Sequence, residues 1–227
     1  MTLGDLIFRT SRKAGLDDDV PDEHTLMLGW ARDAVIEVLL RAHCTVETST
    51  MTLNVGSYLY GIDPVVLAVI NAQLSDGSEL EVTQLANLRK RQKVGSSSPI
   101  RMLAIEGDRL YVYPTPTAAD ILVWDFVPRP QQLLTNPGDD PSTVTFGRIP
   151  TEYHRALEYY MLWQAGEYDD KKFSQTPQDL EKRFDDECKK VHQRKLGKRG
   201  LGSPRPLIGY PGRQQVPSRN DEDVVYG

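Results

Sequence analysis

The feature that most constrains the fold of this chain is a change in the spacing of its apolar residues, from helical to extended and back to helical. Residues 26–42 carry apolar side chains at helical spacing, whereas TVETSTMTLNV (residues 45–55) alternates like a β-strand and is rich in β-branched residues. Helical spacing returns after residue 150 and again after residue 176. Because the helical segments lie at both ends, we expect distant helices to pack together, with the β region as an insert.

We therefore predict an α+β protein that consists of a four-helix bundle, an inserted small antiparallel β-sheet domain and an extended C-terminal arm. The predicted segments are the N-terminal helices of the bundle (residues 1–44), the β-rich domain (45–148), the C-terminal helices of the bundle (149–200) and the arm (201–227). A chain of 227 residues can bury a substantial core, about 70% of its unfolded surface.

Local signals mark where the predicted helices begin. Thr2 and Asp5 have the spacing of a capping box. Pro21 is suited to the first turn of a second helix, and Thr176 with Pro177 begins the last one.

Two of the predicted helices have apolar surfaces suited to packing. The helix over 26–42 is apolar on more than half of its circumference, which indicates contacts on two sides, within the bundle or between subunits. The helix after residue 150 has an aromatic face. The residues expected to make these packing contacts are Trp30, Val38, Tyr153, Leu157 and Tyr160.

The most regular pattern in the β region is RLYVYPTPTAADILVWDFVPRP (residues 109–130). It contains two apolar runs separated by a short polar turn, and each run ends in a pair of prolines. Because proline cannot donate to a strand ladder, we interpret the two runs as a hairpin whose strands are the edges of one small antiparallel sheet. A further hairpin is expected around Gly107 and Asp108.

Residues 201–227 differ in kind from the rest of the chain. They contain four prolines and four glycines and show no amphipathic period, so they cannot offset their own ordering entropy. We interpret them as an extended arm that lies on a neighbouring protein, with a disordered tail as the alternative. The side chains expected to dock are Leu207, Ile208, Tyr210, Val224, Val225 and Tyr226.

No recognisable active site is found in the sequence. The histidines lack the spacing of metal ligands, and GSSSP (residues 95–99) lacks the lysine of a phosphate-binding loop. The acidic stretch DDDVPDE (residues 17–23) lacks the glycine and the final glutamate of a calcium-binding loop, so we interpret it as a solvated helix start. We expect neither an enzyme nor a bound metal or cofactor.

Two clusters of basic residues stand out. The first contains Arg89, Lys90, Arg91 and Lys93, and the second, at the end of the last helix, includes Lys195, Lys198 and Arg199. Each cluster either forms a solvated surface or contacts DNA phosphates or an acidic protein partner.

Net charge, the length of the apolar runs and the cysteine count argue against other classes of protein. The net charge of −5 argues against a freely diffusing nucleic-acid-binding protein. No apolar run approaches the roughly 18 residues needed to span a membrane, so we expect no membrane partner. The two cysteines make no disulfide framework, which indicates folding in a reducing compartment such as a cytoplasm.

The order of the segments resembles that of phage head-to-tail connector proteins of the adaptor, or tail-tubular, type. The similarity begins with MTLGDLIFRT and PDEHTLMLGWARDAVIEVL, and continues through YLYGIDPVVLAVINAQLSDGSELEVTQL. It is clearest in GDRLYVYPTPTAADILVWDFVPRPQQL, and it extends to IPTEYHRALEYYMLWQAGEYDD. The likeness covers roughly residues 1 to 170.

The resemblance implies a structural protein of the virion neck, made in the bacterial host cytoplasm and free of catalytic motifs. Such proteins form a ring, usually of twelve copies, that docks on the portal protein and contacts a tail or nozzle protein. Double-stranded DNA passes through the channel during packaging and ejection. The alternatives are another neck or tail ring component (a stopper or terminator), a small DNA-binding regulatory protein and an enzyme with an unfamiliar site.

Overall fold

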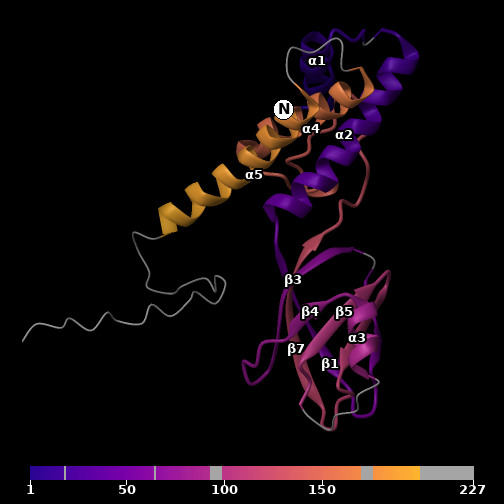
Figure 1. Cartoon of the computed structure of the whole chain (residues 1–227), viewed down its shortest axis with the longest axis vertical. Helices are drawn as coiled ribbons and strands as arrows, with labels where there is room; N and C mark the ends of the chain where they lie inside the picture. The colour runs from indigo at the N-terminus through magenta and orange to yellow at the C-terminus, as the bar shows by residue number, and fades with distance from the viewer. Residues whose placement is uncertain (18, 64, 93–98, 170–175, 200–227) are drawn as a thin grey trace, which may run out of the picture.

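A computed structural model describes residues 1–17, 19–63, 65–92, 99–169 and 176–199, and for 191–199 it describes the backbone alone. The molecule is elongated, with most of its helices at one end and its β-sheets at the other (Figure 1). It is a mixed α+β fold in which the described residues form five α-helices and two small sheets.

Four helices form the helical end. They are α1 (Leu3–Ala14), α2 (Pro21–Ala42), α4 (His154–Tyr168) and α5 (Pro177–Arg199). The helices α1 and α5 each contact both α2 and α4, and all four contribute to one apolar core. The second half of α5 extends away from the other helices (Figure 1). A four-helix bundle in the strict sense stays a prediction.

The local signals that predicted where the helices begin are confirmed. Thr2 caps α1 by accepting a hydrogen bond from the backbone N–H of Asp5, whose carboxylate accepts from the backbone N–H of Thr2. Pro21 is in the first turn of α2. The hydroxyl of Thr176 accepts from the backbone N–H of Asp179 at 3.3 Å, which caps α5.

The other end of the molecule contains two sheets. The first has the order β1 (Glu47–Leu53), β7 (Asp120–Pro128), β3 (Val66–Leu74), and the second has the order β2 (Leu59–Gly61), β6 (Arg109–Tyr113), β5 (Met102–Glu106), β4 (Glu81–Thr83). Residues from both sheets, among them Leu53, Leu110 and Leu122, form a second core, and the helix α3 (Leu85–Gln92) packs on β5. Two 3₁₀ helices, η1 (Val144–Phe146) and η2 (Thr151–Tyr153), precede α4.

The predicted hairpin over residues 109–130 is wrong. The strand β6 pairs with β2 and β5, whereas β7 pairs with β1 and β3, so the two apolar runs belong to different sheets. Neither run is an edge strand, because each has a neighbour on both sides. Pro128 lies at the last paired position of β7, where a missing N–H donor costs the ladder little. The second hairpin is confirmed, since β5 and β6 pair across the turn at Gly107.

The prediction of one small antiparallel sheet in the β region is also wrong. There are two sheets, and β4 pairs with β5 in parallel. Burial alternates along β6 and β7, so each strand has one buried face. The two strands belong to different sheets, and their buried faces meet in the core between those sheets.

The segment that leads from β7 to α4 packs on the helices. Leu134 is buried in the helical core, and its carbonyl accepts from Nε of Arg32 at 2.7 Å. The backbone N–H groups of Leu3 and Gly4, in the first turn of α1, donate to the carbonyls of Asp139 and Pro137. The predicted segment boundaries stay predictions.

Gly147, within this segment, is expected to tolerate no side chain. Its φ of 116° is a backbone conformation that favours glycine, and an added Cβ would lie 3.2 Å from Cγ1 of Val35. We expect Gly147→Ala to lower the free energy of unfolding by about 1–3 kcal/mol, measured by urea denaturation. The control is Gly138→Ala, where the new Cβ would meet nothing within 4 Å and the change should not exceed about 0.5 kcal/mol. Equal effects of the two substitutions would contradict the explanation.

Candidate functional site

Two titratable groups of the kinds used in catalysis, His154 and Cys188, are buried in the helical end. Burial lowers the pKa of His154, which is 6% exposed, and raises the pKa of Cys188 to about 12, so this thiol is protonated at neutral pH. Within the described ranges, no three histidine, cysteine or acidic residues are grouped as a metal would need. No described helix is both long and apolar enough to cross a membrane.

The residues predicted to make packing contacts lie in or beside the helical core. Val38, Tyr153 and Leu157 are almost completely buried, and Tyr160 is 8% exposed. Trp30 is partly buried at the margin of the same core and meets the ring of Tyr168 edge-on, with centroids 6.1 Å apart. These contacts are all within one chain.

The two predicted basic clusters lie on different parts of the molecule. Arg89, Lys90 and Arg91 are exposed on α3, at the β end, where Arg91 is 3.7 Å from the carboxylate of Glu81. The second cluster is at the C-terminal end of α5, in the half that extends away from the other helices (Figure 1). The described parts of the two clusters therefore do not form one basic surface.

Other predicted site residues are outside the described part of the structure. Lys93 is not among the described residues, and of Lys195, Lys198 and Arg199 only the helical backbone is described. The predicted docking residues of the arm also lie outside the described residues: Leu207, Ile208, Tyr210, Val224, Val225 and Tyr226.

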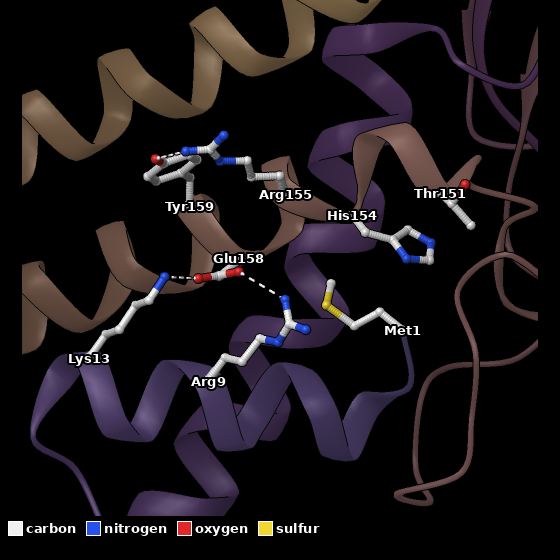
Figure 2. Close-up of a pocket in the computed structure, with 8 residues that line it drawn as sticks. All are labelled: Met1, Arg9, Lys13, Thr151, His154, Arg155, Glu158 and Tyr159. Carbon is white, nitrogen blue, oxygen red and sulfur yellow. Dashed lines mark hydrogen bonds and ion pairs between the residues drawn. The ribbon is translucent and has the colours of Figure 1, made fainter.

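A pocket between α1 and α4 was missed by the sequence reasoning. We call it the α1–α4 pocket; its volume is about 510 Å³, and it is lined by Met1, Arg9, Lys13, Thr151, His154, Arg155, Glu158 and Tyr159 (Figure 2). The four-residue spacing of Arg9 and Lys13 places both side chains on one face of α1, toward α4. That spacing was visible in the sequence, but the acidic residue they meet is more than 140 positions away.

Charge is distributed unevenly in this pocket. The carboxylate of Glu158 is 9% exposed and pairs with Nζ of Lys13 and, at 3.9 Å, with the guanidinium of Arg9. Arg155 donates to the hydroxyl of Tyr159 at 3.1 Å and lies 3.9 Å from the carboxylate of Glu187. Figure 2 shows the buried carboxylate of Glu158 between Lys13 and Arg9, whereas the guanidinium of Arg155 points toward Tyr159. We call the three exposed cations that line the pocket, Arg9, Lys13 and Arg155, its rim.

The described structure suits binding and assembly. Its body is elongated, its two ends have separate cores, and a charged pocket lies between α1 and α4. The model of the SU10 adaptor protein family matches residues 1–204. The chain belongs to this family of phage adaptor proteins, which confirms the resemblance to head-to-tail connectors. Comparison with curated proteins finds no match.

Proposed function

We propose that this protein is a structural component of the virion that forms the adaptor ring between capsid and tail. The ring docks on the portal protein, contacts a tail or nozzle protein and lets double-stranded DNA pass through its channel. The observation that carries the proposal is the family match over residues 1–204. We expect about twelve copies in the ring, as the resemblance implies.

The architecture supports a role between two larger partners. Each subunit has a helical end and a β end with separate cores, so different partners can be bound at the two ends (Figure 1). The outward face of the sheet containing β1 and β7 is also available for contacts, since Thr50, Thr52 and Ile121 are exposed there. The arm, with the six docking residues predicted above, attaches each subunit to the portal.

The proposal is tested by electron microscopy of the full chain mixed with its portal protein. We expect a ring stacked coaxially on the portal, with a central channel wide enough for a DNA duplex of roughly 20 Å. Particles that remain monomeric at all portal concentrations would contradict the proposal.

The purified protein is expected to bind duplex DNA weakly. Its net charge of −5 opposes association with phosphates, and the basic clusters lie on different parts of each subunit. A gel shift at about 150 mM salt should show no complex below micromolar protein, because nonspecific affinities at physiological salt are typically 10⁻⁴–10⁻⁶ M. Tight binding at that salt concentration would favour a DNA-binding protein instead.

A further inference from the structure

The rim of the α1–α4 pocket presents positive charge to solvent. The side chains of Arg9, Lys13 and Arg155 are 58%, 59% and 67% exposed, whereas Glu158 beneath them is 9% exposed. Arginine has five N–H donors and lysine has three, so the contacts of Arg9 and Lys13 with Glu158, and of Arg155 with Tyr159 and Glu187, leave several of these donors unused. The pocket can therefore accept further carboxylates at its rim.

The same chain carries an acidic segment that suits this pocket. We call the described residues 17 and 19–23 the acidic link; they lie between α1 and the first turn of α2, and no lysine or arginine occurs between residues 14 and 31. Asp17, Asp19 and Asp22 are exposed. Among the described residues, none of these three takes part in an ion pair of the structure.

Hydrogen bonds join described residues of the acidic link to one another. The backbone N–H of Asp19 donates to the carboxylate of Asp17 at 3.0 Å, and the backbone N–H of Asp17 donates to the carboxylate of Glu23. Because these bonds already restrain Asp17, Asp19 and Glu23, less of their ordering entropy is lost on binding.

The acidic link has an exposed apolar side chain among its charges, since Val20 is 41% exposed. In Figure 2, α1 and α4 lie in front and α2 lies behind them. The pocket and the helix that follows the acidic link are therefore on different sides of α1 and α4.

We propose that the acidic link of one subunit docks in the α1–α4 pocket of the next subunit in the ring, an inference that rests on the adaptor ring proposed above. The two surfaces differ, so the contact is heterologous, and a rotation that repeats it closes a ring in which every pocket is occupied. The carboxylates of the link neutralise the exposed rim. A duplex is a poorer occupant, because the acidic chain repels phosphates while every neighbouring subunit supplies the link.

Paired charge reversals test this contact. The pocket variant is Arg9→Glu with Arg155→Glu, which retains Lys13 to pair with the buried Glu158. The link variant is Asp19→Arg with Asp22→Arg. The controls are Arg109→Glu and Asp108→Lys at the β end, where both side chains are at least 60% exposed. The measurement is the concentration of full-length protein at which half of the subunits are in rings, alone and on portal, by native mass spectrometry.

We expect each variant to raise this concentration at least about tenfold, the combination of both variants to restore it and the controls to leave it unchanged. Rings that form equally well in the pocket and link variants would overturn the proposed contact and leave the adaptor role intact. A wild-type protein that forms no ring, even on portal, would overturn both. A pocket variant that loses DNA binding and still forms normal rings would assign the rim to phosphates and overturn the contact.

A second measurement does not depend on the stability of the variants. Subunits labelled with ¹⁵N and unlabelled subunits are mixed in rings and treated with a zero-length carbodiimide cross-linker. We expect cross-links between Lys13 and the acidic link that join labelled to unlabelled peptides. Cross-links confined to peptides of the same label would overturn the contact.

Discussion

Leu157→Asp is expected to prevent folding. Leu157 is completely buried in the helical core, where the new carboxylate would have no cation to pair with. Burying an unpaired charge costs several kcal/mol, a large part of the roughly 5–15 kcal/mol by which a domain is stable. Val38→Asp, on α2, should have the same effect, because Val38 is equally buried in that core. The measurement is circular dichroism during urea titration, which should show no cooperative transition.

Two further substitutions test whether the effect of Leu157→Asp comes from burying a charge, and not from helix propensity or from charge alone. Leu157→Ala keeps the helix and removes only apolar contacts, so it should cost about 2–5 kcal/mol and still unfold cooperatively. Leu133→Asp introduces the same charge at a residue that is 56% exposed, and should change stability by no more than about 0.5 kcal/mol. If Leu157→Asp unfolds cooperatively with the stability of the wild type, the assignment of Leu157 to the core is wrong.

Deletion of residues 201–227 is expected to abolish attachment to portal-bearing capsids and leave the protein folded. Every residue of the two cores, and of the contact between α3 and β5, lies between Leu3 and Cys188, so the deletion removes none of them. Circular dichroism and the melting temperature should match those of the full chain. Co-sedimentation with capsids should fall to background, because in the proposed function the arm supplies the docking side chains.

Point substitutions within the arm distinguish apolar docking from charge. Replacing Leu207, Ile208 and Tyr210 by serine should reproduce the loss of attachment, whereas replacing Arg205 and Arg213 by serine should not. Normal attachment of the deletion variant would contradict the docking role. It would leave ring formation through the α1–α4 pocket as a separate question, since that contact does not involve the arm.

The resemblance was sufficient to predict the family, but the candidate site was only partly predictable. The residues on α3 and the arm were chosen from composition, and composition does not tell whether an exposed cation contacts anything. The α1–α4 pocket was missed because Lys13 and Glu158 are 145 residues apart. Neither residue is unusual in its own helix, so no local pattern distinguishes them.

Local signals in the sequence were enough to locate several of the helices and strands. The capping box of Thr2, the proline at position 21 and the alternation in β1 act over a few residues, and each local energy is the same in any fold. The tertiary structure alone decided how the strands pair. The alternation of β6 and β7 shows that each has one buried face, and this is satisfied equally well by a hairpin or by two sheets that face each other. Packing across the core between the sheets, which joins residues far apart in the chain, selected the second arrangement and also brought α1 and α4 together to form the pocket.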